Sequence, residues 1–239
     1  MTAKNILNNI SRRNIIKFGA ASVGTSLVTA GIGSQLLSPE PAVGVANNNI
    51  TPDAALNLLM EGNKRFVSGK IRRTNQTLAN LRAVSKSQKP FAAILSCADS
   101  RVPSEILFDR GFGDLFICRV AGNVVTAEET GRLEFGTLVL GAKVLLVMGH
   151  KKCGAVDATI KGAQVPGQIA SLLDAIKPGI AKLDPKKADQ LEAGVKANVV
   201  YQVQKIQESP VISKLVADGQ LKVVGGYFDF DSGKISLLS

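Results

Sequence analysis

The chain has 239 residues, a length that allows one or two domains and a full hydrophobic core. Its composition, 45% hydrophobic and 20% charged, excludes a disordered chain. The net charge of +10 indicates a surface that attracts small anions, and no nucleic-acid partner is expected, because the basic pairs are short, far apart and not interleaved with aromatic residues.

Residues 1–46 resemble a twin-arginine (Tat) export signal peptide. Arg12 and Arg13 precede a weakly apolar, glycine-containing run from Phe18 to Leu37. Small residues in "PAVGVANNN" then predict cleavage after Ala46. We therefore expect export by the Tat machinery to the periplasm or an equivalent extracytoplasmic compartment. The alternatives are an uncleaved anchor, or a core helix that follows a chance arginine pair.

Two helices and a buried strand are predicted next. The stretch 51–70 predicts a helix, with Thr51 as its N-cap, Pro52 at its first position and an apolar stripe. A shorter helix is expected over 76–85. The run "KPFAAILSC" (89–97) is apolar without alternation, which is typical of a strand buried on both faces.

The same order of elements then recurs. Residues 113–123 predict a strand that runs into a glycine-containing loop. Residues 126–142 predict a helix in which Thr126 and Glu129 have the spacing of a capping box. Residues 143–154 predict a second buried strand that ends in a polar loop.

The remaining chain completes an α/β pattern. Helices are expected over 155–163, 167–182, 185–208 and 209–219, and a strand, a turn and a short last strand over 221–238. Strands that alternate with helices predict an α/β fold with a mostly parallel central sheet flanked by helices, ending in a short antiparallel strand.

Residues that can bind a metal gather at the ends of two predicted strands. His150, the only histidine, stands three positions before Cys153, and Cys97 and Asp99 follow the strand 89–97. If the two strands are neighbours, both loops meet at the carboxyl edge of the sheet. Two thiols and one imidazole are zinc ligands by type, and they leave a fourth position for water or a carboxylate.

Each of these residues also has an ordinary structural interpretation. A buried cysteine is often a small hydrophobe, and a lone histidine is often only hydrogen-bonded. Asp99 could cap a helix or pair with Arg101, and Cys97 could form a disulfide with Cys153. Their coincidence on two loops favours a metal site.

Over nearly all of residues 51–239 the sequence resembles the β-class carbonic anhydrases. The motifs that carry the resemblance are "CADSR" (97–101), "RVAGN" (119–123), "LEFG" (133–136), "GHKKCGA" (149–155), "SP" (209–210) and "VVGGYFDFDSG" (223–233). The resemblance implies that family's fold and one zinc ion per chain, held by Cys97, His150 and Cys153.

The resemblance also implies a reaction and a substrate pocket. The reaction is the reversible hydration of carbon dioxide to bicarbonate and a proton by a zinc-bound hydroxide, which Asp99 and Arg101 orient. In some family members the aspartate takes the fourth zinc position instead, and the sequence leaves both states of Asp99 open. The implied pocket contains the amide of Gln88, the apolar side chain of Phe116 and the backbone N–H of Gly154.

In the family this pocket lies between two subunits. The resemblance therefore implies a homodimer or a dimer of dimers. In it, residues 47–88 form a helical arm at the dimer interface, and residues 89–239 form the zinc-binding α/β core. Two positions depart from the pattern, since Phe135 stands where many members have tyrosine and Ala121 stands where a larger aliphatic residue is common. The third cysteine, Cys118, is expected in the core.

Two other kinds of function stay open beside carbon dioxide hydration. One is a hydrolase of CS2 or COS on the same scaffold. The other is a non-catalytic protein that binds zinc or bicarbonate, or a dithiol redox protein. A redox role would favour two cysteines in a CxxC spacing, which the sequence lacks.

Overall fold

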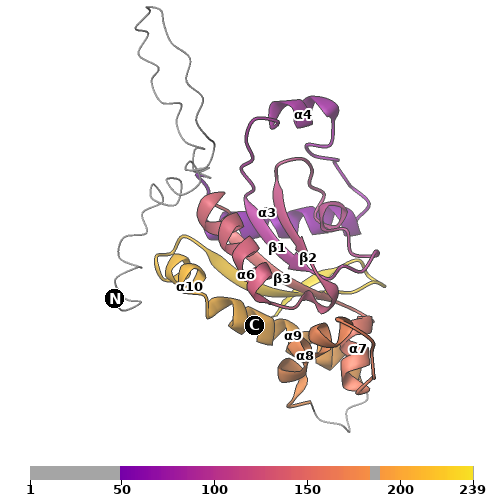
Figure 1. The fold of residues 1–239 in the computed structure, drawn as a ribbon. Coiled ribbons are helices and arrows are strands. Elements are labelled where there is room, and N and C mark those ends of the chain that lie inside the picture. The colour runs from indigo at the N-terminus through magenta and orange to yellow at the C-terminus, as the bar shows by residue number, and fades with distance from the viewer. Residues whose placement is uncertain (1–48, 184–188, 239) are drawn as a thin grey trace, which may run out of the picture. The chain divides into compact units, whose positions relative to one another are not determined.

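A computed structural model describes residues 49–183 and 189–238 (Figure 1). These residues belong to one compact unit. The export signal expected over 1–46 lies outside the described residues. Within the described ranges, no helix has both the length and the apolar character needed to cross a lipid bilayer.

A central sheet of five strands organises the fold, in the order β2-β1-β3-β4-β5. The strands are β1 (Ala92–Ser96), β2 (Leu115–Arg119), β3 (Val144–His150), β4 (Lys222–Phe228) and β5 (Ile235–Leu238). The pairings among β2, β1, β3 and β4 are parallel, and β5 runs antiparallel to β4. The predicted fold class is confirmed, including its antiparallel last strand. Because β1 pairs directly with β3, the two loops that carry the candidate ligands leave adjacent strands.

Helices cover both faces of this sheet. The helices of the described residues are α3 (Pro52–Val67), α4 (Leu78–Ala83), α5 (Ser104–Leu107), α6 (Ala127–Glu134), α7 (Gly154–Ile160), α8 (Ile169–Ile180), α9 (Gln190–Gln207) and α10 (Pro210–Ala217), with a 3-10 turn η2 (Ala121–Asn123) and a π-helical turn η3 (Phe135–Val139). In Figure 1, α3 lies behind the sheet, while α6, α9 and α10 lie on the other face. Each predicted helix has a counterpart in the structure.

The two faces of the sheet form two separate core layers. Along β1, Ala92 and Ile94 pack with α3, whereas Ala93 and Leu95 pack with α6, α9 and α10. Successive side chains of a strand point to opposite faces, so a strand covered on both sides is apolar throughout. Cys118 belongs to the second layer and is 2% exposed, as predicted, and burial raises the pKa of its thiol to about 11.

A buried carboxylate joins the N-terminal helix to the core. Asp109 accepts a hydrogen bond from Arg65 Nε at 2.6 Å and others from the backbone N–H groups of Arg72 and Arg73. Burial alone would raise the pKa of Asp109, but these donors outweigh it and the pKa is lowered. These contacts fix α3 and the segment that follows it against the sheet.

Two local predictions around α6 were wrong. The hydroxyl of Thr126 does not cap the helix by accepting a backbone N–H; it donates to the carboxylates of Glu128 and Glu129. The single helix expected over 126–142 also changes to a π-helical turn at Phe135. Gly136 there lies close to the Phe116 ring, since a Cβ at this glycine would come within 2.6 Å of it. This contact keeps the altered turn against β2.

Candidate metal centre

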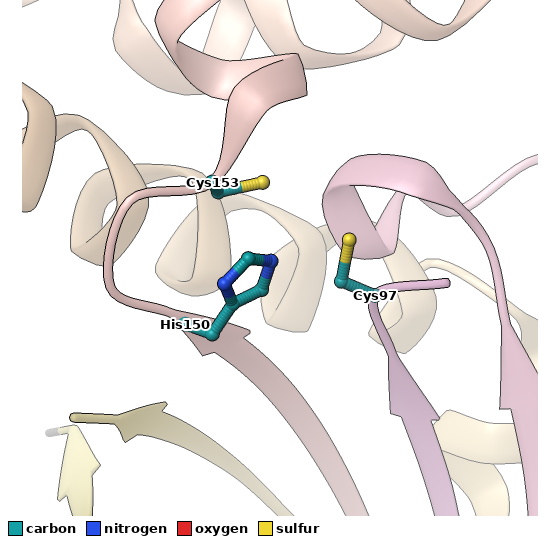
Figure 2. Close-up of side chains that lie close together, drawn as sticks. All are labelled: Cys97, His150 and Cys153. Carbon is teal, nitrogen blue, oxygen red and sulfur yellow. The ribbon is translucent and has the colours of Figure 1, made fainter. Parts of the chain in front are cut away.

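The structure brings Cys97, His150 and Cys153 together at the carboxyl edge of the sheet (Figure 2). Cys97 follows β1, His150 ends β3, and Cys153 is the N-cap of α7. Their ligand atoms lie within 4.8 Å of one another. The three side chains are buried, with exposed fractions of 4%, 0% and 1%.

The imidazole of His150 is held with one nitrogen free. Its Nδ1 lies 2.9 Å from the carbonyl oxygen of Lys151 and can donate a hydrogen bond to it. Its Nε2 is buried and has no hydrogen-bond partner. A histidine that donates from one nitrogen presents the lone pair of the other, which is the arrangement of a metal ligand. Gly149 allows this placement, because a Cβ there would come within 2.8 Å of two valines of α9.

The sulfur of Cys97 accepts a hydrogen bond from the turn η2, and side chains of α9 hold that turn in place. The backbone N–H of Gly122 donates to Cys97 Sγ at 3.4 Å. Gly122 has φ +72°, a conformation that glycine adopts at low cost, and its carbonyl oxygen accepts from Asn198 Nδ2 at 2.8 Å. Asn198 in turn accepts from Gln202 Nε2, and Gln202 Oε1 accepts from the N–H of Val125. This chain of bonds fixes the donor that faces the sulfur.

The two sulfurs are free thiols that affect each other's ionisation. The hydrogen bond from Cys153 lowers the pKa of Cys97, with a further contribution from His150. The same hydrogen bond and burial raise the pKa of Cys153. Thiolate is the ligand form of cysteine, so a divalent metal bound here would displace the protons of these thiols. The structure does not contain the Cys97–Cys153 disulfide that was the alternative to a metal site.

These features meet the requirements of a zinc site. Two sulfurs and one bare imidazole nitrogen are the ligand types that zinc prefers. They are buried and within reach of one ion, and the unpartnered Nε2 of His150 would otherwise be an unsatisfied polar atom. Among the described residues, this is the group of side chains found to be close enough to hold a metal ion.

Asp99 and Arg101 form a forked ion pair beside this group. Arg101 Nε donates to Asp99 Oδ1 at 2.9 Å and Arg101 Nη2 donates to Oδ2 at 2.7 Å. Asp99 Oδ2 lies 3.9 Å from His150 Nε2. The guanidinium holds the pKa of Asp99 well below its usual range, so the carboxylate stays ionised.

This ion pair adds little to stability. The Arg101 side chain is 53% exposed, and water and salt screen the attraction within such exposed pairs. Its effect is orientation, because a bidentate pair fixes the plane of the carboxylate. Arg119 supports the same loop from β2, where it donates to the carbonyl oxygens of Cys97 and Asp99 at 3.2 and 2.5 Å.

The three residues expected in the substrate pocket occupy different parts of the chain. Gly154 is exposed, with open space where a Cβ would lie, directly after Cys153. Gln88 is exposed in the segment before β1. Phe116, whose ring centroid lies 6.2 Å from that of Phe135, is the second residue of β2. Gln88 and Phe116 thus lie towards the amino ends of the strands, opposite the metal-binding group of their own chain.

Several residues around the site were not predicted from the sequence. Arg119 is the first residue of the motif "RVAGN", but the motif did not indicate that its side chain bonds to the loop after β1. Asn198 and Gln202 appear as ordinary polar residues of a helix. The ring of Phe230 lies 5.3 Å from the ring of His150, and Arg101 Cζ lies 4.4 Å from its centroid. Asn198 and Gln202 are four residues apart on α9, and this spacing could have indicated that their side chains lie on one face of the helix.

A buried Cys2His group at the carboxyl edge of a mostly parallel sheet defines a metalloprotein of the α/β class. The sequence profile of the family described as carbonic anhydrase matches residues 92–235. "Carbonic anhydrase 2" of Mycobacterium tuberculosis is 34% identical over 196 residues, which cover 79% of this chain and 94% of that protein.

Solved structures agree with this match. A Coccomyxa β-carbonic anhydrase has a TM-score of 0.62 at 28% identity and covers 77% of this chain and 86% of its own. A β-carbonic anhydrase from Sordaria macrospora has a TM-score of 0.64 at 20% identity, covering 78% and 98% of the two chains, and supports the fold. The chain belongs to the carbonic anhydrase family, in its β class, whose members are zinc enzymes.

Proposed function

We propose that the chain hydrates carbon dioxide reversibly to bicarbonate and a proton, with zinc held by Cys97, His150 and Cys153. The observation that carries the proposal is the position of Asp99. Its carboxylate, held in a fork by Arg101, lies 3.9 Å from the bare Nε2 of His150 in a chain of the carbonic anhydrase family.

When bound, zinc supplies the Lewis acidity that makes hydroxide available from water near neutral pH. Cys97 and Cys153 supply two negative charges that balance the charge of the ion. Asp99 accepts a hydrogen bond from the reacting O–H group and so directs an oxygen lone pair towards the carbon of the substrate. Arg101 keeps that carboxylate ionised and fixed in plane.

Both oxygens of Asp99 are engaged by Arg101, which supports an activating role for Asp99 rather than that of a fourth ligand. An aspartate that bound the metal at rest would have to give up at least part of this fork. The same site chemistry would act on CS2 or COS, and no feature of the described residues favours those substrates over carbon dioxide.

The proposal is tested with the chain lacking residues 1–46. Zinc content is measured by atomic absorption, and hydration is followed by stopped-flow change of a pH indicator on mixing with carbon dioxide. We expect about one zinc per chain and catalysis at neutral pH. Zinc without hydration, but with hydrolysis of CS2 or COS, would favour the alternative enzyme. Zinc with no turnover of any of the three would indicate a non-catalytic binding protein.

A homodimer or a dimer of dimers is part of the proposal, because two of the residues that the family resemblance implies for the pocket lie away from the metal-binding group of their own chain. Gln88 and Phe116 lie towards the amino ends of the strands, so a partner subunit would have to bring its copies to the metal site. Exposed apolar side chains on α4, Leu78 at 60% and Leu81 at 41%, provide surface for such contact. The Sordaria protein is described as tetrameric. Light scattering after gel filtration distinguishes a dimer or tetramer from a monomer, and a monomer with full activity contradicts this part of the proposal.

Export by the Tat route is the last part of the proposal. We expect the double substitution Arg12→Lys and Arg13→Lys to keep the full-length protein in the cytoplasm of a Gram-negative host, because the paired arginines are the recognised feature of the signal. The measurement is carbonic anhydrase antigen in periplasmic and cytoplasmic fractions. A control with Lys4→Arg and Lys17→Arg should be exported normally. Unchanged export of the Arg12/Arg13 variant would reject the signal.

A further inference from the structure

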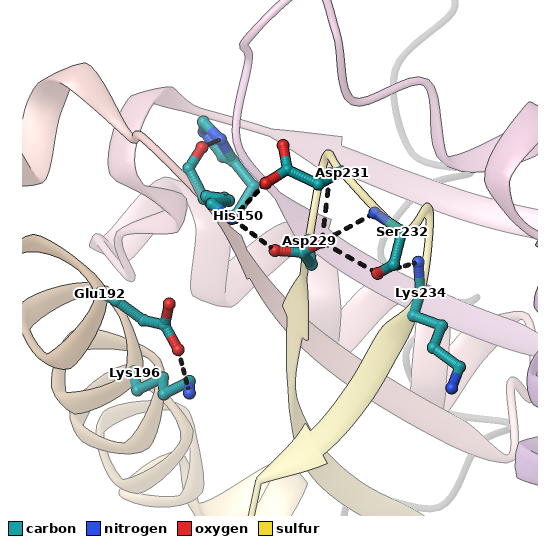
Figure 3. A network of polar contacts seen from close by, with 8 residues as sticks. His150, Glu192, Lys196, Asp229, Asp231, Ser232 and Lys234 are labelled. Carbon is teal, nitrogen blue, oxygen red and sulfur yellow. Dashed lines mark hydrogen bonds and ion pairs between the residues drawn. The ribbon is translucent and has the colours of Figure 1, made fainter. Parts of the chain in front are cut away.

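The turn between β4 and β5, residues 229–234, has a closed and well-fixed shape (Figure 3). The N–H of Asp229 donates to the carbonyl of Lys234, and the N–H of Gly233 donates to the carbonyl of Asp229, both at 2.9 Å. The carboxylate Oδ1 of Asp229 also accepts from the N–H groups of Asp231 and Ser232 and from the Ser232 hydroxyl. With this many internal bonds, the turn can hold a side chain in a fixed position.

Lys151 joins this turn to the metal-binding group. Its Nζ donates to Asp229 Oδ2 at 3.0 Å and to Asp231 Oδ2 at 2.7 Å, and its backbone N–H donates to the carbonyl of Phe228. The carbonyl oxygen of the same lysine accepts the hydrogen bond from His150 Nδ1. One residue therefore connects the turn to the orientation of the imidazole.

Phe230 lies in this turn and contacts both halves of the site. Its ring centroid is 5.3 Å from that of His150, and Arg101 Cζ lies 4.4 Å from the same centroid. Phe228 supports it edge-on, at 5.3 Å and an interplanar angle of 84°. A guanidinium within about 6 Å of an aromatic centroid is attracted by the ring. The phenyl ring is thus shared by a candidate metal ligand and by the arginine that orients Asp99.

We propose that Phe230 is a positioning residue, which fixes the guanidinium of Arg101 relative to the imidazole of His150 and so keeps the Asp99 carboxylate directed at the metal centre. The inference deepens the proposed function and rests on it. Arg101 is more than half exposed on its own chain, so its fork with Asp99 would otherwise depend on a flexible side chain. Lys151, with Asp229 and Asp231, holds the turn that carries the ring.

Phe66 provides a matched control. It is also a partly buried phenylalanine packed on the core layer of α3, and its ring lies against the same turn, 3.1 Å from where a Cβ of Gly233 would be. Its substitution removes a comparable amount of apolar contact from the turn. A difference between Phe66→Leu and Phe230→Leu therefore reports the contacts to His150 and Arg101.

The experiment measures three quantities in the zinc-loaded enzyme: the rate of zinc transfer to a chromogenic chelator, kcat and KM for carbon dioxide hydration, and the thermal unfolding midpoint. For Phe230→Leu we expect zinc loss about tenfold faster and kcat about tenfold lower, with KM little changed. Residues that contact metal ligands and orient them typically have effects of this size when they are replaced. Phe66→Leu should lower the unfolding midpoint similarly but leave both rates near wild type. Phe230→Tyr, which keeps the ring face, should restore both.

Lys151→Met provides a variant that leaves the apolar core intact and is expected to change both rates in the same direction as Phe230→Leu. Equal zinc-loss rates in Phe230→Leu and Phe66→Leu would overturn the positioning role, as would a Phe230→Tyr enzyme as impaired as Phe230→Leu. If the wild type binds zinc but does not hydrate carbon dioxide, the proposed function fails, while the zinc-loss comparison still decides the contact of Phe230 with His150.

Discussion

Replacing Cys153 with serine is expected to abolish both zinc binding and carbon dioxide hydration. A serine hydroxyl is not deprotonated near neutral pH and is a poor zinc ligand, so only Cys97 and His150 would remain. Two protein ligands do not retain zinc as a three-ligand catalytic site does. We expect purified protein with little zinc and activity lower by on the order of a thousandfold or more. Zinc per chain and the initial rate of hydration measure both effects.

Cys118→Ser is the matched control for this change. Cys118 is as buried as Cys153 but belongs to the core layer of α6, α9 and α10, away from the metal-binding group. A hydroxyl there costs about 1–3 kcal/mol of stability, while zinc content per folded chain should be unchanged. If Cys153→Ser kept a full complement of zinc, or if Cys118→Ser lost it, the assignment of the ligands would be wrong.

Replacing Asp99 with asparagine is expected to keep zinc and remove most of the activity. The amide has nearly the same shape but no charge, and it presents only one acceptor oxygen to Arg101 and to the reacting O–H group. We expect kcat to fall by about a hundredfold, which is typical when a positioned proton acceptor is lost. The measurement is kcat per bound zinc. Asp174→Asn removes an exposed carboxylate that pairs with Lys177 and should have no effect.

The pH dependence of this variant gives a second test. An unperturbed aspartate is already ionised between pH 9 and 6, and Arg101 lowers the pKa of Asp99 further, so the carboxylate does not titrate in that window. The ratio of wild-type to Asp99→Asn activity should therefore be constant across that window. A fully active Asp99→Asn enzyme would contradict the mechanism. A wild type that gains activity only above about pH 8 would indicate that Asp99 binds the metal at rest.

The fold was predictable from the sequence because its strands are covered on both faces. The apolar run 89–97 has no alternation, and the structure explains this by the two core layers on either side of β1. A continuous apolar run does not mark where a strand begins and ends, and β1 covers only Ala92–Ser96 of the predicted run. The start of the helix at Thr126 was not predictable in the same way. The spacing of a capping box does not determine whether the threonine hydroxyl accepts or donates a hydrogen bond, and here it donates to Glu129.

The ligands of the site were predictable for a chemical reason, and their supports were not. Cysteine and histidine are few in this chain, and their positions after two strands indicate one place in the fold. Asn198 and Phe230 are common residue types in a helix and a strand-turn segment. The contact of Asn198 with Gly122 joins residues 76 apart in the sequence, and the contact of Phe230 with Arg101 joins residues 129 apart. Both depend on tertiary packing, which local sequence does not reveal.

The direct pairing of β1 with β3 makes strand length a determinant of metal binding. In β3, Val144, Leu146 and Met148 pack in the layer of α3, and His150 has the same parity as these residues. Deleting a single residue between Val144 and Met148 would leave "GHKKCG" intact yet move the imidazole to the position now held by Gly149, where Val195 and Val199 of α9 lie within 2.8 Å of a Cβ. An intact motif on a shortened strand would thus identify a relative that has lost its metal.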